Sequence, residues 1–274
     1  MKKKTIVTII AVLVVLLSAA FFNRAKIRSA YDDWQKGNLP GATPYGQVQK
    51  KIAFVNGSVE TVDIIPLEAD LQMPAAKSQP PAQQSLPDEI NLDVPFVAQA
   101  PYAVWDAIHE DTCEEASAIM AAHFVLKKTI PDAAYAEKEI LKMINWENKN
   151  FGFSKDTNAE KTAGMIRGVY GLKNVEVKYD ITLDDIRNAV GEGYPVILPL
   201  YGRGLNPYFS GEGPLYHMLV VRGYTAHGQL ITNDPGTKRG KDYVYNGAYL
   251  VDRIHDWNEG DVINGRKVMI IVKE

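Results

Sequence analysis

The chain has 274 residues and a single cysteine, Cys113, whose surroundings favour chemistry over simple packing. Asp111-Thr112-Cys113-Glu114-Glu115 is typical of a helix start, because Thr112 and Glu115 have the spacing of a capping box. Cys113 then lies in the first turn, where unpaired backbone N–H groups and the helix dipole lower the pKa of a thiol. Glu114 and Glu115 oppose thiolate formation unless they cap the helix or pair with a cation. The alternative for a lone cysteine is a small buried hydrophobic residue.

A thiol nucleophile needs a base, and the base needs a group that orients it. His217 lies at the head of the apolar run Tyr216–Tyr224, where an imidazole is costly to bury unless it is hydrogen-bonded. A second apolar run, Gln229–Thr232, follows and leads into Asn233-Asp234-Pro235. If the two runs form a hairpin, the carboxylate of Asp234 returns to the strand that carries His217. This requires offset strands or a turn longer than two residues, and the sequence leaves both open.

The four other histidines fit this chemistry less well. We expect His109 in the loop before Cys113, His123 in mid-helix, His227 in a turn and His255 in a late helical segment. No HExxH motif is present, and the acidic and histidine residues near Cys113 lack metal-ligand spacing. The sequence therefore predicts neither a metal site nor an organic cofactor.

Helical patterns precede strand patterns along the chain. The expected helices are 113–128, 133–148, 159–170 and 182–190, and the expected strands are 195–201, 216–224, 229–232 and 268–273. Helices followed by strands predict an α+β fold with a central nucleophile helix packed on an antiparallel sheet.

The N-terminus predicts a membrane anchor. Thr5–Phe22 carries no charge, and a helix needs about 17–25 apolar residues to span a bilayer. A cleaved signal peptide, with a cut near Ser18 and Ala20, is the alternative. Basic residues flank the span equally, but a short basic N-terminus usually stays in the cytoplasm. We therefore expect a single-pass protein of the cell membrane with its domain outside, or a secreted protein if the segment is cleaved.

The rest of the chain divides by composition. Residues 23–88 are expected to be a proline-rich linker, with a small hairpin at 51–64 around Asn56-Gly57, and residues 89–274 a packed domain. Hydrophobic residues make up 46% and charged residues 23%, which is ordinary for a globular protein. The net charge of -3 and pI of about 6.0 argue against a nucleic-acid partner, and no signal indicates the oligomeric state.

Four motifs together resemble the papain-like cysteine peptidases. More narrowly, they are similar to the bacteriocin-processing, double-glycine type known as family 39, in its stand-alone form. The motifs are Val94–Gln99, Cys113–Ser117, Tyr216–Tyr224 and Asn233–Pro235, and they occur in the expected order of Gln, Cys, His and Asp. The chain departs from the family in the long interval before Cys113 and in having Glu114, where a glycine usually follows the cysteine.

The resemblance implies a papain-like fold and hydrolysis of a peptide bond in a peptide or protein substrate. It also implies that Gln99 donates to the oxyanion, beside the catalytic Cys113, His217 and Asp234. We expect the loop 202–213 to flank the cleft, although it could equally be a plain surface loop. Two other readings are a cell-wall amidase or endopeptidase on the same fold, and a catalytically inactive extracytoplasmic binding module.

Overall fold

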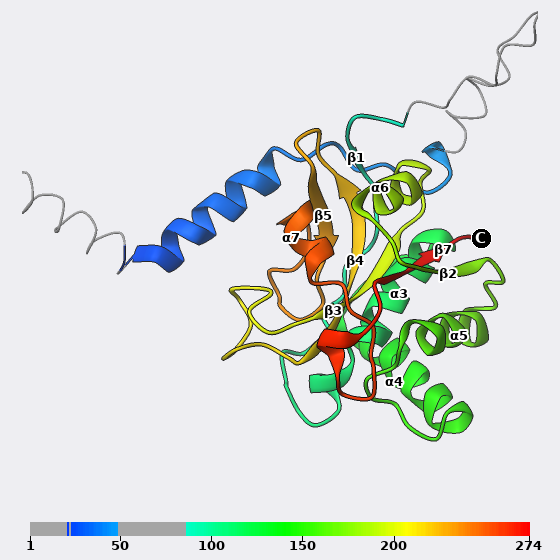
Figure 1. Ribbon diagram of the computed structural model, residues 1–274. Coiled ribbons are helices and arrows are strands. Elements are labelled where there is room, and N and C mark those ends of the chain that lie inside the picture. Colours follow the sequence, from blue (N-terminus) through cyan, green and yellow to red (C-terminus); the bar gives the residue numbers. More distant parts are fainter. Residues whose placement is uncertain (1–20, 22, 49–85) are drawn as a thin grey trace, which may run out of the picture.

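The computed structural model describes residues 21, 23–48 and 86–274 (Figure 1). The predicted span Thr5–Phe22, apart from Phe21, and the predicted hairpin at 51–64 lie outside these residues. Within the described part of the chain, no helix is both long and apolar enough to cross a membrane.

A seven-stranded sheet forms the centre of the domain, and all its strand pairs are antiparallel. Six strands follow the order β2-β7-β3-β4-β5-β6, and β1 pairs with β4. Every residue of β4 is buried, because strands pair on both of its edges and helices pack against it. The strands are β1 (Ile90–Asn91), β2 (Val175–Tyr179), β3 (Val196–Tyr201), β4 (Tyr216–Tyr224), β5 (Gln229–Asn233), β6 (Tyr243–Asn246) and β7 (Val268–Val272).

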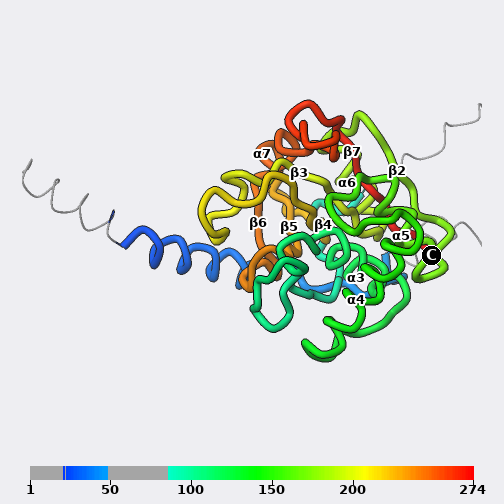
Figure 2. Tube along the Cα trace, turned by 90° about the horizontal axis from the view of Figure 1, so that it is seen from below, coloured from blue at the N-terminus to red at the C-terminus, as the bar shows by residue number. Residues whose placement is uncertain are grey.

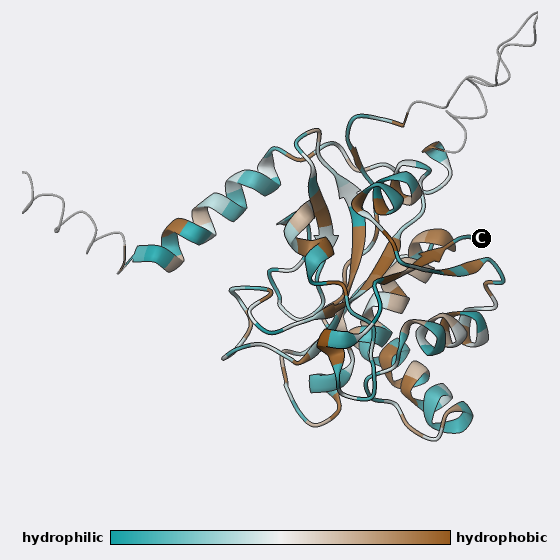
Figure 3. Ribbon diagram, viewed as in Figure 1, coloured by the Kyte–Doolittle hydropathy of each residue, from teal (hydrophilic) through white to brown (hydrophobic). Residues whose placement is uncertain are grey.

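Helices cover both sides of the sheet. The helix α3 contacts β3, β4 and β7 and is itself in contact with α4 and α5, whereas α6 and α7 contact each other and the β3–β6 part of the sheet (Figures 1 and 2). The helices are α3 (Cys113–Val125), α4 (Ala133–Asn150), α5 (Ala159–Tyr170), α6 (Leu183–Gly191) and α7 (Gly247–Asp252), with short 3₁₀ turns η1 (His109–Asp111) and η2 (Val262–Asn264). Figure 3 shows that hydrophobic residues gather on the strands and on the helices beside them.

Local sequence signals explain where several helices begin and end. Asp132 caps α4 and Asn158 caps α5, and α5 ends at Gly171, whose φ of 72° is the left-handed conformation that suits glycine. The helix α6 begins with a complete capping box formed by Thr182 and Asp185. The α+β class predicted from the sequence is confirmed, and helices precede most of the strands along the chain.

The start of α3 differs from the prediction. The hydroxyl of Thr112 makes no cap and instead donates to the backbone oxygen of Gln99 at 3.0 Å, so the predicted capping box with Glu115 is wrong. Every residue from Cys113 to Val125 is also buried, including the residues that point away from the sheet. The physical reason is that α4 and α5 cover α3 on the sides that the sheet leaves open. A helix buried all round has no solvent-facing side on which Glu114 and Glu115 could be hydrated.

The chain before the domain also packs on it. A helix at residues 23–37 lies beside the loop that precedes β4, and the hydroxyl of Tyr208 donates to Asp32 at 2.6 Å. The guanidinium of Arg239 donates to Ser29 at 2.7 Å on the same helix. Farther along, Thr43 bridges to Leu92 next to β1. In Figure 3 most of this N-terminal helix is hydrophilic, so it is polar contacts that fix it to the domain.

Candidate active site

Cys113 begins α3, but its thiol is buried rather than exposed at the helix end. The residue is 5% exposed, and its S–H donates to Oε2 of Glu114 at 3.0 Å. Burial raises the pKa of the thiol well above its ordinary value, and the charge and hydrogen bond of Glu114 raise it further. A backbone hydrogen bond from Met218, the residue after His217, acts in the opposite direction. The expectation of a thiol activated by the helix terminus is therefore wrong for this structure, because burial and the neighbouring carboxylate outweigh the dipole.

His217 and Asp234 meet as the hairpin argument predicted. Nε2 of His217 lies 2.8 Å from Oδ1 of Asp234, and both side chains are almost fully buried. The strands β4 and β5 pair with Val220 opposite Asn233, and a β-bulge lies between Val221 and Gly223. The bulge and a turn longer than two residues supply the offset that the sequence left open.

Four donors hold the carboxylate of Asp234. Oδ1 accepts from His217 and from the backbone N–H of Gly236 at 3.0 Å, and Oδ2 accepts from Asn206 at 2.8 Å and from Tyr245 at 2.7 Å. Burial by itself would raise the pKa of Asp234, but the charge of His217 and these hydrogen bonds outweigh burial and lower the pKa below its ordinary value. Asp234 is therefore held as a carboxylate that can orient and stabilise a protonated imidazole.

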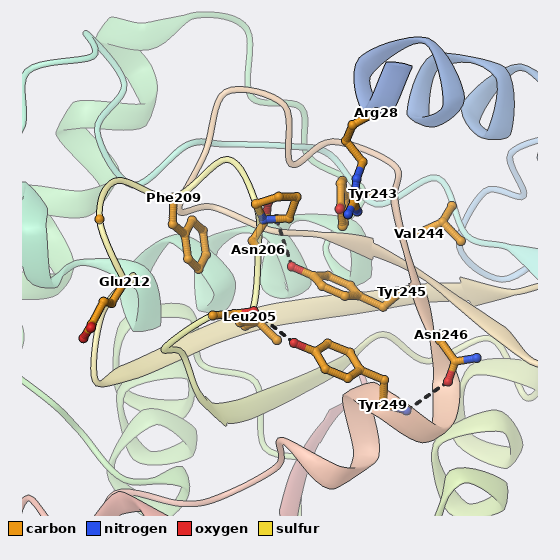
Figure 4. A pocket seen from close by; sticks show the side chains of 13 residues that line it. Arg28, Leu205, Asn206, Phe209, Glu212, Tyr243, Val244, Tyr245, Asn246 and Tyr249 are labelled. Atoms are coloured by element: carbon orange, nitrogen blue, oxygen red, sulfur yellow. Dashed lines mark hydrogen bonds between the residues drawn. The ribbon is translucent and has the colours of Figure 1, made fainter. Parts of the chain in front are cut away.

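Asn206 and Tyr245 were not expected from the sequence. Asn206 lies in the loop before β4 and Tyr245 lies on the short strand β6, and neither adjoins a recognisable motif. Both also line a cavity of about 400 Å³, shown in Figure 4, together with Phe209 and Tyr249. The cavity therefore adjoins the two residues that hold Oδ2 of Asp234.

The loop before β4 covers the imidazole, as expected for a loop that flanks the site. The rings of Phe209 and His217 are 5.0 Å apart and 75° to each other, which is an edge-on contact. A Cβ added at Gly236 would lie 2.7 Å from Phe209 and 2.9 Å from His217, so only glycine fits beside this contact. No hydrogen bond joins Cys113 to His217 in the structure, and Nδ1 of His217 is left available because Nε2 is bound to Asp234.

Gln99 lies near the start of α3, with its amide turned to the backbone. Nε2 donates to the carbonyl oxygens of His109 at 2.9 Å and Glu110 at 3.1 Å, while the buried Oε1 has no hydrogen-bond partner in the part of the chain that the structure describes. The side chain of Gln99 thus holds the turn η1 in place. His109 is held in this turn by Asp106 and by Glu137 of α4 at 3.0 Å, which is a structural role.

Three buried carboxyl groups lie along α3 and α4. Burial raises the pKa of Glu114 to about 8 and that of Glu147 to about 7, and burial together with the charge of Glu147 raises the pKa of Glu115 well above its ordinary value. Among the described residues, no group of His, Cys, Asp and Glu side chains could hold a metal ion. Because their pKa values are raised, the three carboxyl groups keep their protons to a higher pH than exposed carboxyl groups do.

Comparison with known proteins gives a family match over most of the domain. The family described as Peptidase_C39 like family matches residues 91–259, which include Gln99, Cys113, His217 and Asp234. This match confirms the resemblance to a papain-like peptidase of that type. A comparison with curated protein sequences gave no match.

The chain is also similar to solved structures. One, described as a C39-like peptidase from Bacillus anthracis, has 14% identity and a TM-score of 0.43, covering 68% of this chain and 98% of that chain. A prointerpain A fragment from Prevotella intermedia has 14% identity and a TM-score of 0.34, covering 50% and 41%. Digestive procathepsin L 3 from the larval midgut of Tenebrio molitor has 12% identity and a TM-score of 0.40, covering 92% and 89%.

Proposed function

Because the chain belongs to the Peptidase_C39 like family, we propose that it is a cysteine peptidase. Cys113 is the nucleophile, His217 is the base, and Asp234 orients the base. The observation that carries this proposal is the buried hydrogen bond of 2.8 Å between His217 and Asp234, together with the backbone hydrogen bond that Met218, the residue after His217, makes to the thiol of the only cysteine of the chain. A buried histidine–carboxylate pair and a nearby thiol are the parts that acyl transfer through a thioester needs.

The proposed mechanism follows from which ring nitrogen of His217 is already hydrogen-bonded. Nε2 of His217 is bound to Asp234, so Nδ1 takes the proton of the Cys113 thiol. The thiolate attacks the scissile carbonyl, and the protonated imidazole then gives its proton to the leaving amine. Water, activated by His217, hydrolyses the thioester and restores the thiol. Asp234 stays ionised throughout, because four donors surround its carboxylate.

For the oxyanion we propose two donors, the side-chain amide of Gln99 and the backbone N–H of Cys113. Donors that are already aimed at the developing charge contribute about 2.7–4 kcal/mol each in acyl transfer. The amide of Gln99 is bound to the carbonyls of His109 and Glu110, so this role requires the substrate oxygen to replace one of them.

We further propose that Thr5–Phe22 anchors the protein in the cell membrane with the peptidase domain outside. A peptide or protein is the proposed substrate. Localisation of a tagged full-length chain, with protease added to intact cells, tests the orientation independently of activity.

The test of catalysis is labelling of Cys113 by iodoacetamide across pH, in the wild type and in His217→Ala. Since Cys113 is the only cysteine, the label reports on one sulfur. We expect faster labelling near neutral pH in the wild type, lost in His217→Ala, followed by cleavage of peptides in a substrate screen. Equal and slow labelling in both proteins would refute the peptidase and favour a binding module. Activity on purified peptidoglycan alone would instead assign a cell-wall hydrolase.

A further inference from the structure

Glu114 contacts the proposed nucleophile directly. Its Oε2 lies 3.0 Å from the sulfur of Cys113, and its Oε1 accepts the backbone N–H of Thr157 at 3.0 Å. The residue is 2% exposed. Both oxygens are therefore fixed, one by the backbone between α4 and α5 and the other by the thiol.

No cation compensates this carboxyl group, because none of the ion pairs among the described residues includes it. The titratable groups that face it are thiol, carboxyl and phenol groups. They are Cys113 and Glu115 on α3, Glu147 on α4, Asp156 in the following loop and Tyr216 on β4. Acidic neighbours favour the neutral form, and burial does the same, so Glu114 keeps its proton up to a pH of about 8.

We propose that Glu114 serves the nucleophile as a neutral carboxylic acid, whose O–H donates to the Cys113 sulfur once the thiol has given its proton to His217. This inference rests on the proposed peptidase function and adds a residue that touches the reacting atom. The ionised form does the opposite, since its oxygen accepts the S–H and keeps the thiol protonated.

The proton transfers balance without a further reactant. The thiol S–H bond breaks, the proton passes to Nδ1 of His217, and the electron pair stays on the sulfur. Glu114 retains its own proton and turns it toward the sulfur, while Oε1 still accepts from Thr157. Met218 supplies a second donor to the sulfur through its backbone N–H. The thiolate then has two hydrogen-bond donors, the O–H of Glu114 and the backbone N–H of Met218. If Glu114 were ionised, the thiolate would have one donor, Met218, and one negative charge beside it.

The consequence is an upper pH limit on reactivity that an ordinary thiol does not have. The labelling rate of an isolated thiol rises as it ionises, and then stays level. Here the ionisation of Glu114 places a negative charge beside the sulfur. If this charge raises the pKa of the thiol by one unit, the fraction of thiolate at a given pH falls about tenfold. The part of the labelling rate that depends on His217, which is the wild-type rate less the rate of His217→Ala, should therefore fall above the pKa of Glu114, because transfer of the proton from Cys113 to His217 does not itself become more favourable as pH rises.

The substitution Glu114→Gln separates the two forms. The amide has the shape of the neutral acid, can accept from Thr157 with its oxygen, can donate to sulfur with its nitrogen and cannot ionise. Glu115→Gln is the matched control, because Glu115 is equally buried on the same helix but makes no hydrogen bond to Cys113. Iodoacetamide labelling is measured across pH for all three proteins, and each is also examined with His217→Ala.

We expect Glu114→Gln to lack the falling limb of the wild type, so that the ratio of its His217-dependent labelling rate to that of the wild type rises about tenfold across the pKa of Glu114. The Glu115→Gln control should keep the falling limb of the wild type. Loss of labelling at neutral pH in a folded Glu114→Gln protein would overturn the proposal, because it would make the ionised carboxylate the active form. A His217-dependent rate, taken as the wild-type rate less that of His217→Ala, that does not fall through this range would also overturn it.

Failure of the peptidase proposal would look different. In that case His217→Ala would label as fast as the wild type near neutral pH. The effect of Glu114 is then measured as the pKa of the Cys113 thiol, from the ultraviolet absorbance of the thiolate, with the sole cysteine as the only source. Glu114→Gln must lower that pKa by about one unit or more, and an unchanged pKa would reject the role of Glu114 whatever the protein catalyses.

Discussion

Tyr245 offers a direct test of how the carboxylate of Asp234 is held. Its hydroxyl donates to Oδ2 at 2.7 Å, and the residue is 4% exposed. The substitution Tyr245→Phe removes this hydroxyl and leaves the ring, so it opens little space in the core. Among the described residues, Asn206 then remains as the only side-chain donor to Oδ2. A hydrogen bond to a buried charged group contributes about 1.5–3 kcal/mol, and we expect the free energy of unfolding to fall by this amount.

The same substitution should act on the site in a defined direction. With one donor lost, three donors instead of four hold the carboxylate of Asp234 in place, so the orientation of His217 that this carboxylate fixes loses stabilisation. A loss of about 1.4 kcal/mol in that stabilisation corresponds to a tenfold lower rate, so we expect iodoacetamide labelling of Cys113 to slow about tenfold.

Urea unfolding at several pH values tests the energetic part. The pKa of Asp234 is lowered in the folded state, so its contribution to stability is full above the unfolded pKa and is lost as pH falls through the folded pKa. The difference in free energy of unfolding between wild type and Tyr245→Phe should therefore narrow toward acid pH. Tyr249→Phe is the control, because Tyr249 lines the same cavity but donates to the backbone oxygen of Gly204. Equal losses for both variants, independent of pH, would refute the reasoning.

Two further substitutions test the buried groups. Glu147→Gln should flatten the dependence of the free energy of unfolding on pH between 4.5, the ordinary pKa of Glu147, and about 7, its pKa in the folded protein. The reason is that Glu147 in the folded wild type keeps a proton that the unfolded chain releases, and the full effect is on the order of 3 kcal/mol. An unchanged slope in urea unfolding would contradict this prediction. Gly236→Ala should slow labelling of Cys113 at least about tenfold, since its Cβ would lie 2.9 Å from His217 and 2.7 Å from Phe209. Wild-type labelling in a folded Gly236→Ala protein would show that the imidazole tolerates displacement.

Parts of the fold that rest on local signals could be predicted from the sequence. The helix α5 and the strand β4 have the bounds that their apolar patterns indicate. The meeting of His217 and Asp234 was also predictable, because a hairpin limits where the chain can return.

What could not be predicted depends on packing between distant segments. The complete burial of α3 results from α4 and α5, and nothing in the sequence of α3 states which elements will cover it. Because α3 is buried, Glu114 is hydrogen-bonded to the thiol of Cys113 and not to water. Asn206 comes from a loop and Tyr245 from a four-residue strand, and each becomes a donor to Asp234 only when the sheet is assembled.

The packing of the N-terminal segment has a consequence for a cut chain. Residues on both sides of the interval 49–85 already bind the domain: the segment ending at residue 48 through Asp32 and Thr43, and the segment from residue 86 through the hydrogen bond of Tyr224 to Pro87. Covalent continuity across that interval is thus not what holds residues 23–48 in place. A protease cut within it would yield a nicked, two-chain protein, with the N-terminal fragment still seated beside Tyr208.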